Sequence, residues 1–376
     1  MKKKKKNDYI SYKDVKQIID KNGLQYLLMI GQRSNGKSYA AKELALRESY
    51  KTGQPAFTYL RRHQSSLKMY MISEYWSDMC VPDEAGNTAI YYITNGEYDT
   101  IIVYQKAIYL GKTDPESGKV ERGLLIGYAH ALTELEALKS RQFPTVKYIL
   151  FEEFIATGLY LYQEPDRLQN YVSTVLRDRQ GCVLMIGNTI SRIVPYFTEW
   201  CLDNIHKQEQ GTVDVYKFET ENTQTKIGVF LCESMHKSSG MFFGSSAKMI
   251  IGGEWDRHEQ SKLPGDRESY VCLYNVVFKY TDKAVFLLSF LQAREHPDNF
   301  LWYVEPKTTK IQDGTRVVTP ELSDDPLYTK DFTPIHPKEK ILFDYIKLDR
   351  IAYSDNLTGT EFKRCVEMLH SATTRT

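Results

Sequence analysis

Short apolar runs separated by longer mixed segments dominate the first 230 or so residues of the chain. This alternation is typical of strands that cross over through helices into a mostly parallel sheet. An α/β domain is therefore expected in this part of the chain. Its central strands are predicted at residues 25–30, 55–60, 146–151 and 182–187.

The segment at residues 89–128 interrupts that rhythm. Its apolar runs AIYYI, DTIIVYQ and KAIYLG are separated by NGE and by TDPESGK. Turn residues between short apolar runs predict an inserted antiparallel hairpin or meander. Further on, residues 168–179 (LQNYVSTVLRDR) have the apolar spacing of an amphipathic helix.

A change of composition divides the chain at residues 233–269, which are rich in Gly, Ser and charge and weak in periodicity. Two long β-runs follow at residues 270–280 and 284–291, and a helical pattern at residues 361–369 closes a small α+β domain. The expected parts are a basic N-terminal extension at 1–20, an α/β domain at 21–232, a linker at 233–269 and an α+β domain at 270–376.

Length and composition agree with two folded domains. The 376 residues are 42% hydrophobic and 26% charged, which suits buried cores and not a disordered chain. The chain has 49 basic and 48 acidic residues. Its net charge of +1 creates no overall positive potential that would attract nucleic acid. Any contact with DNA must therefore be local.

Several classes of protein are not expected. No apolar run reaches the roughly 18 residues of a membrane span, and the lysine-rich start is followed by polar residues instead of a secretory leader. The six cysteines lie far apart without CxxC pairs, so neither a zinc site nor a disulfide framework is predicted. Reduced thiols in a cytoplasm fit this pattern best.

Residues 31–38 read GQRSNGKS and match the phosphate-loop pattern GxxxxGK[ST] at every fixed position, between an apolar strand and a helical stretch. The glycines let backbone N–H groups surround a β-phosphate, Lys37 adds a charge for the outer oxygens, and Ser38 can hold Mg²⁺. A chance match is the alternative, and the flanking strand and helix argue against it. The predicted nucleotide-binding residues are Gly31, Gln32, Arg33, Ser34, Asn35, Gly36, Lys37 and Ser38.

Two carboxylates end the apolar run at residues 148–153 (YILFEE). A Mg²⁺-nucleotide site needs one carboxylate near the metal and another that orients the attacking water. Glu152 is expected in the first role and Glu153 in the second. Acids that are merely exposed at the end of a buried strand are the alternative. Asp is more usual than Glu in the first position, so Glu152 is a departure.

Three polar residues further along have two readings each. Arg177 and Arg179 end the predicted helix, where cations are favourable without any function, and an arginine finger for a neighbouring subunit is the alternative. Asn188 follows the strand at residues 182–187. It is a candidate sensor of the γ-phosphate, and a cap of the next helix is the other interpretation.

The segments GQRSNGKSYA, YLRR, YILFEEF, VLRDR and GNTISRIVPYF together resemble the DNA-packaging ATPases of phi29-type tailed phages. Order and spacing agree across most of the first 200 residues. The resemblance implies an additional-strand P-loop NTPase that forms a homo-oligomeric ring, expected to be a pentamer. With ATP and Mg²⁺, such a ring docks on the portal vertex of an empty capsid in the host cytoplasm and drives double-stranded DNA inward. Whether a structural RNA takes part is left open.

The resemblance also implies roles for single residues. Arg33, Arg61 and Arg62 match family positions, while His63 and Gln64 stand where relatives tend to have a lysine. The roles carried over are phosphate binding by Lys37, Mg²⁺ binding by Ser38 and Glu152, catalysis by Glu153 and a finger supplied in trans by Arg177.

In such motors the second domain resembles a degenerate RNase H-like nuclease. A working metal nuclease needs clustered carboxylates around two ions. Because Asp282, Glu305 and Asp344 are scattered acids, no nuclease activity is expected.

Contacts with DNA are expected from basic residues on loops, which would meet phosphates without reading bases. Plain solubilising residues are the alternative, because exposed lysines on turns often serve only that purpose. The candidates in the inserted meander are Lys106, Lys112, Lys119 and Arg122.

Two other functions remain open. A helicase or recombinase-like ATPase would carry the same catalytic residues, and a capsid or portal adaptor would keep the phosphate loop for structure alone. A GTP-binding switch is disfavoured because the chain has no NKxD motif.

Overall fold

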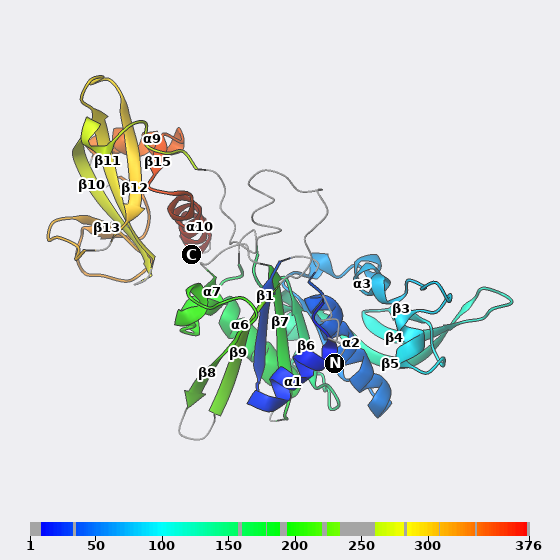
Figure 1. Ribbon diagram of the computed structural model, residues 1–376. Helices are drawn as coiled ribbons and strands as arrows, with labels where there is room; N and C mark the ends of the chain where they lie inside the picture. The colour runs from blue at the N-terminus through cyan, green and yellow to red at the C-terminus, as the bar shows by residue number, and fades with distance from the viewer. Residues whose placement is uncertain are drawn as a thin grey trace, which may run out of the picture.

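The computed structural model shows a large sheet flanked by helices and a smaller second sheet (Figure 1). The residues that it describes are 9–32, 35–156, 160–177, 179–188, 194–219, 224–233, 260–281, 284–307, 309–334 and 337–373.

The first sheet has nine strands in the order β3-β4-β5-β2-β6-β7-β1-β9-β8. Neighbours pair parallel from β5 through β9, and antiparallel pairs lie only at the two edges. The bounds in chain order are β1 Tyr26–Gly31, β2 Phe57–Arg61, β3 Thr100–Tyr104, β4 Ala107–Thr113, β5 Val120–Ala131, β6 Tyr148–Glu152, β7 Cys182–Asn188, β8 Val213–Glu219 and β9 Gln224–Cys232.

Strand β7 lies between β1, which precedes the phosphate loop, and β6, which ends in the two carboxylates. Gly31 of β1 pairs with Asn188 of β7, and Glu152 of β6 pairs with Ile186 of β7. The carboxyl ends of all three strands therefore lie side by side. Ligands of open α/β sheets bind beyond these carboxyl ends. The predicted fold, a mostly parallel P-loop sheet with an additional strand, is confirmed.

Helices cover both faces of this sheet. Because side chains alternate along a strand, Leu27 and Met29 of β1 join the core under one set of helices, while Leu28 and Ile30 join the core on the opposite face. The first set is α1 Tyr12–Asn22, α2 Lys37–Thr52, α3 Met69–Trp76 and α4 Ala89–Ile93; the opposite face carries α5 Leu135–Leu138, α6 Glu164–Leu176 and α7 Pro195–Glu199.

The inserted segment is an antiparallel meander of β3, β4 and β5, as predicted. The AIYYI run at its start is helix α4, however, so the expectation of a further β-run is wrong. The hydroxyl of Thr88 accepts a hydrogen bond from the N–H of Tyr91 at 3.1 Å and caps the first turn. The helical turn then buries Ile90 and Ile93 on one side, which a strand could not do.

The second sheet has six strands in the order β14-β13-β10-β11-β12-β15. Together with two helices it forms the predicted α+β unit. Its elements are β10 Tyr270–Thr281, β11 Ala284–Ala293, β12 Phe300–Pro306, β13 Arg316–Val318, β14 Tyr328–Thr329, α9 Pro337–Lys347, β15 Ile351–Tyr353 and α10 Asn356–Thr373.

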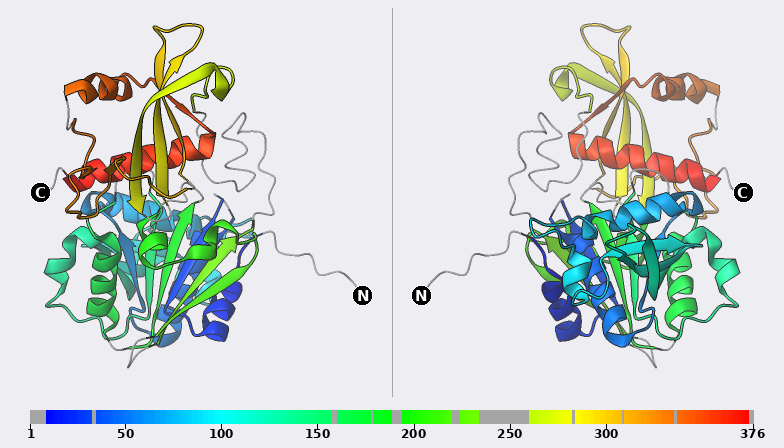
Figure 2. Two further views of the ribbon diagram at one scale, coloured as in Figure 1. Left: turned by 90° about the vertical axis from the view of Figure 1, so that its left-hand side faces the viewer. Right: turned by 90° about the vertical axis from the view of Figure 1, so that its right-hand side faces the viewer.

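Helix α10 lies between the second sheet and the first unit (Figure 2). It is longer than the predicted helix at residues 361–369. The buried apolar cluster on the α5 to α7 face continues into the second unit, where it includes Phe286 of β11 and Phe362 of α10. The two units therefore share one apolar cluster, to which α10 contributes Phe362.

Two stretches near the predicted domain limits are folded. Residues 12–20, expected in the N-terminal extension, lie in α1, whose Val15 and Ile19 are buried. In the predicted linker, Ser261 accepts a backbone hydrogen bond from Tyr353 at 2.8 Å, so this end of the linker packs on the second unit. The domain limits themselves stay a prediction. Among the helices described, none combines the length and apolarity needed to cross a membrane.

Candidate nucleotide site

The phosphate loop joins the end of β1 to the start of α2. Gly36 has a φ of +87°, a conformation that glycine adopts at no steric cost. A Cβ on Gly31 would lie only 2.7 Å from the Asn35 amide nitrogen and 2.8 Å from the carbonyl oxygen of Cys232. Both glycine positions of the motif therefore need glycine for steric reasons, and the loop presents the positive end of α2 to a ligand.

The Lys37 side chain folds back over this loop. Its ammonium donates hydrogen bonds to the carbonyl oxygens of Gln32 at 2.6 Å and Gly31 at 3.2 Å. Carbonyl oxygens hold a positive charge here in the way that phosphate oxygens would. A triphosphate bound to the loop would take the place of some of these acceptors.

Asn188 at the end of β7 also reaches this ammonium. Its Oδ1 accepts a hydrogen bond from Lys37 Nζ at 3.1 Å. The parallel pairing of Gly31 with Asn188 explains the contact, because it places both strand ends side by side. The sensor role stays a prediction, and so does the helix-cap alternative, since residues 189–193 lie outside the described part.

Glu152, the last residue of β6, is buried beside the start of α2. Its Oε1 accepts a hydrogen bond from the Tyr75 hydroxyl at 2.8 Å. Burial raises the pKa of Glu152, while the hydroxyls of Tyr75 and the neighbouring Ser38 and the charges of Arg61 and Lys42 oppose the rise. A hydroxyl and a carboxylate beside a phosphate loop form an oxygen donor set that suits Mg²⁺.

Glu153 follows β6 and lies in a strained turn. Its φ of 56° is unusual for a residue with a Cβ. The side chain is 64% exposed, and its Oε2 lies 2.6 Å from Nη2 of Arg61. The structure thus separates the two neighbouring carboxylates: Glu152 is buried beside the start of α2, and Glu153 projects toward solvent with an arginine beside it.

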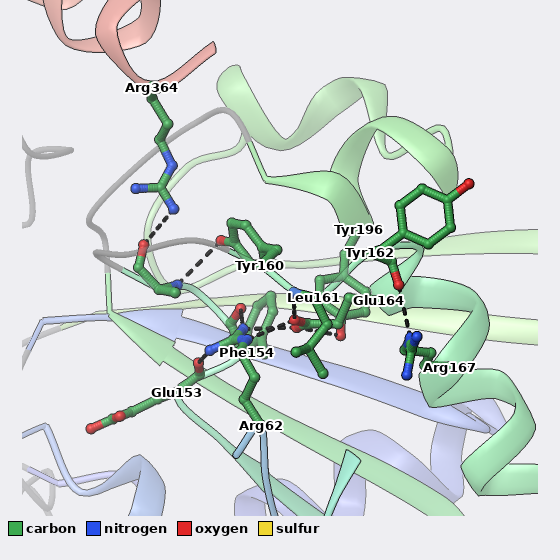
Figure 3. A network of polar contacts seen from close by, with 11 residues as sticks. Arg62, Glu153, Phe154, Tyr160, Leu161, Tyr162, Glu164, Arg167, Tyr196 and Arg364 are labelled. Carbon is green, nitrogen blue, oxygen red and sulfur yellow. Dashed lines mark hydrogen bonds and ion pairs between the residues drawn. The ribbon is translucent and has the colours of Figure 1, made fainter. Parts of the chain in front are cut away.

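A buried polar network contacts the backbone of the Glu153 turn (Figure 3). Arg62 donates to both carboxylate oxygens of Glu164, at 2.6 and 2.8 Å, and to the backbone carbonyl of Glu153 at 3.1 Å. The Tyr196 hydroxyl donates to the same carboxylate at 2.9 Å. The sequence analysis assigned no role to Arg62 and missed Glu164, because an acid in the first turn of a helix ordinarily faces solvent.

Arg177 lies away from the loop of its own chain. Helix α6 begins at Glu164, near the carboxyl edge of the sheet, and ends beside the start of β7 at the opposite edge. Arg179 confirms this placement, because it donates to the carbonyl of Phe143, which precedes β6, at 2.7 Å. Within one chain the structure does not bring Arg177 to Lys37. Arg33 and Ser34, also predicted to bind nucleotide, lie outside the described residues.

Two of the four basic candidates for DNA contact, Lys106 and Arg122, line the same pocket beside α5. Lys106 pairs with Glu134 at 2.6 Å, and Lys112 lies 3.5 Å from Asp99. The Arg122 guanidinium lies over the rings of Tyr104 and Tyr109. Lys119 is exposed in the β4–β5 turn. Their contact with DNA stays a prediction.

Two of the three acids considered for a nuclease site are described, and they lie on different elements. Glu305 lies on β12, and Asp344 of α9 pairs with Lys347 at 3.3 Å. Asp282 lies outside the described residues. Within the described ranges, no three His, Cys, Asp or Glu side chains are grouped as a metal site would need.

Comparison with known proteins shows which proteins part of this chain is similar to. Residues 120–222 match the family described as Podovirus DNA encapsidation protein (Gp16). The DNA packaging protein of Bacillus phage B103 is 30% identical over 212 residues, which are 53% of this chain and 58% of that protein. Over about half of its length, the chain is similar to this DNA packaging protein.

A second relative and a solved structure are also similar to this chain. The DNA packaging protein of Bacillus phage phi29 is 29% identical over 175 residues, 45% of this chain and 44% of that protein. The aligned parts span less than two thirds of the length of either relative. A chain of the bacteriophage Phi-29 viral genome packaging motor assembly has a similar fold, with a TM-score of 0.51, 18% identity and coverage of 94% of this chain and 98% of that one.

Proposed function

We propose that this chain is the ATPase of a phage packaging motor, which hydrolyses ATP to move double-stranded DNA through the portal into an empty capsid. The meeting of three strand ends carries the proposal: Lys37 of the phosphate loop donates to Asn188 of β7 at 3.1 Å, and β7 pairs with β6, which ends in Glu152. Lys37 and Asn188 lie at the same edge of the sheet. The kinship with packaging proteins supports DNA as the polymer that is moved.

Each residue has a chemical task in this proposal. Lys37 would exchange its carbonyl partners for the outer phosphate oxygens, and Ser38 and Glu152 would hold Mg²⁺. The metal supplies charge neutralisation on the phosphates when bound. Glu153, which is exposed beside the loop, would orient a water for in-line attack after its carboxylate leaves Arg61. Arg62 keeps the backbone of that turn in place.

The wider assembly follows from the same family relationship. We propose a homo-oligomeric ring, expected to be pentameric, in which Arg177 of one subunit completes the site of the next. Its partners would be duplex DNA and the portal protein, in the host cytoplasm at the capsid vertex, with a structural RNA as an open question. No nuclease activity is expected, and Mg²⁺- or Mn²⁺-dependent cleavage of plasmid DNA by the protein would contradict this.

The test is ATP turnover by the purified full chain with and without DNA. Stimulation by duplex DNA above that by single strands is expected, because a packaging motor contacts the duplex backbone. Preference for single strands with unwinding would favour a helicase-like ATPase instead. If Lys37→Ala leaves turnover and assembly unchanged, the loop is structural and the chain is an adaptor.

A further inference from the structure

The C-terminal helix α10 makes a polar contact with the segment that follows the catalytic turn. Arg364 is only 8% exposed, and its Nη2 donates a hydrogen bond to the carbonyl oxygen of Ala156 at 2.5 Å. The two residues are 208 positions apart in the chain. Ala156 lies three residues after Glu153, so the contact joins the second unit to the backbone that carries the proposed catalytic carboxylate (Figure 3).

Tyr160 lies between this arginine and the buried network. The guanidinium of Arg364 lies 5.4 Å from the centre of its ring, and that of Arg62 lies 4.9 Å from it. The Tyr160 hydroxyl accepts a hydrogen bond from the Ala156 N–H at 3.2 Å. Burial raises the pKa of this hydroxyl, which therefore remains a neutral partner, while Arg364 opposes the rise.

The next contact reaches the catalytic turn itself. Arg62 donates to the carbonyl oxygens of Glu153 at 3.1 Å and Phe154 at 2.9 Å. Its charge is balanced by the buried carboxylate of Glu164. Backbone in the left-handed region costs a non-glycine residue about 1 kcal/mol or more, and such a turn persists only when its surroundings hold it. Contacts at Glu153, Phe154 and Ala156 are what hold it here.

We propose that Arg364 is a positioning residue, through which α10 fixes the orientation of the Glu153 turn for ATP hydrolysis. The inference rests on the proposed ATPase function and adds that the second unit sets the turnover rate. The contact between Arg364 and Ala156 carries it, together with the Tyr160 ring that lies against both arginines. A shift of α10 would loosen the Glu153 turn. The phosphate loop, which joins β1 to α2, would keep its shape.

The experiment compares full-length Arg364→Ala with Lys363→Ala, which removes the exposed positive charge at the preceding position of the same helix. Arg364→Ala is expected to lower kcat about tenfold or more, because small misplacement of a catalytic group is costly, with KM and ATP binding within about twofold. Lys363→Ala should leave both unchanged. Arg364→Lys should recover part of kcat, because an ammonium can still donate to the Ala156 carbonyl.

Two further measurements separate positioning from a general structural role. Combined with Glu153→Gln, Arg364→Ala should add no further loss, because it acts through Glu153. Hydrogen exchange should become faster at the amides of residues 154–156 in Arg364→Ala while β6 stays protected. If Arg364→Ala does not fold, Tyr160→Phe takes its place and should show the same pattern more weakly.

The inference is overturned if Arg364→Ala behaves like Lys363→Ala, if it weakens ATP binding as much as it lowers kcat, or if its loss adds to that of Glu153→Gln. Failure of the ATPase proposal gives a different result. The unaltered chain would then hydrolyse no ATP, while the exchange measurement would still report whether α10 holds the turn.

Discussion

Lys37 and Asn188 meet at the ends of two neighbouring parallel strands, with Nζ of the lysine 3.1 Å from Oδ1 of the asparagine. The lysine belongs to the phosphate loop, and the asparagine follows it by 151 positions. Because Lys37 also donates to carbonyl oxygens of the loop, its ammonium is held close to where phosphate oxygens would bind. We therefore expect Asn188 to influence how readily this ammonium binds the phosphates of a nucleotide.

Substitution of Asn188 should change nucleotide affinity in a charge-dependent way. Asn188→Asp places a negative charge beside Lys37, which stabilises the empty loop and repels phosphate, so we expect ATP binding to weaken about tenfold or more and Tm to rise slightly. Asn188→Ala should weaken binding less, because the carbonyl partners remain. Titration with a fluorescent ATP analogue measures the affinities, and equal effects of the two variants would contradict this account.

The raised pKa of Glu152 predicts a pH dependence of magnesium-nucleotide binding. Only the ionised carboxylate holds a metal, so binding must release a proton whenever Glu152 is protonated. Apparent affinity should therefore fall as the pH drops through the raised pKa, with a limiting slope of about tenfold per pH unit. In the nucleotide-free protein, the raised pKa of Glu152 also affects the free energy of unfolding. The contribution of Glu152 to stability is full at low pH and is lost as the pH rises through that pKa.

Glu152→Gln is the control for this prediction. It keeps the shape and a partner for the Tyr75 hydroxyl but has no proton to lose. The metal-dependent part of binding should be weak in this variant and insensitive to pH. An unchanged pH profile would show that another group accounts for the dependence.

His130 should make the fold sensitive to acid. Burial lowers its pKa to about 3, with further lowering by the charges of Arg141 and Lys106, and its Nδ1 lies 2.8 Å from the Tyr171 hydroxyl. A pKa depressed below the ordinary 6.5 contributes stability that is full above about pH 6.5 and is lost as the pH falls toward about 3. In chemical denaturation between these limits, the unaltered chain should lose stability more steeply than His130→Gln, and parallel slopes would contradict the assignment.

The placement of Arg177 predicts complementation between subunits. Arg177 and Lys37 lie at opposite edges of the sheet in one chain, so a finger role requires a neighbour. Mixing inactive Arg177→Ala with inactive Lys37→Ala subunits should restore turnover at roughly a quarter of the interfaces of an equal mixture. A mixture of Lys37→Ala with Glu153→Gln is the matched control: every pocket lacks one residue, so it should stay inactive. Equal inactivity of both mixtures would count against the finger.

The phosphate loop and the paired acids could be predicted from the sequence because their signals are local. A strand, a glycine-rich loop and a helix are read from adjacent residues, as are two carboxylates after an apolar run. Alternation of strands and helices also predicted the parallel sheet. The prediction of a β-run at AIYYI was wrong, because five apolar residues are compatible with either a strand or a helix. The N-cap at Thr88 favours the helix.

The supporting network could not be predicted, because its contacts depend on how distant elements pack. Arg62 and Glu164 are 102 positions apart, and neither lies in a pattern that indicates burial. The contact of Arg364 with Ala156 joins two units whose relative placement no local spacing specifies. Such pairs become visible only when the strand order and the helix faces are known.

The central claim is that Lys37 and Glu153 act on the same triphosphate. The most direct test is to measure ATP binding and single-turnover hydrolysis in parallel for the unaltered chain, Lys37→Ala and Glu153→Gln. We expect Lys37→Ala to lose binding, and Glu153→Gln to bind ATP nearly as well as the unaltered chain while hydrolysing it about 10²-fold or more slowly. Undiminished hydrolysis by Glu153→Gln, or undiminished binding by Lys37→Ala, would contradict the account.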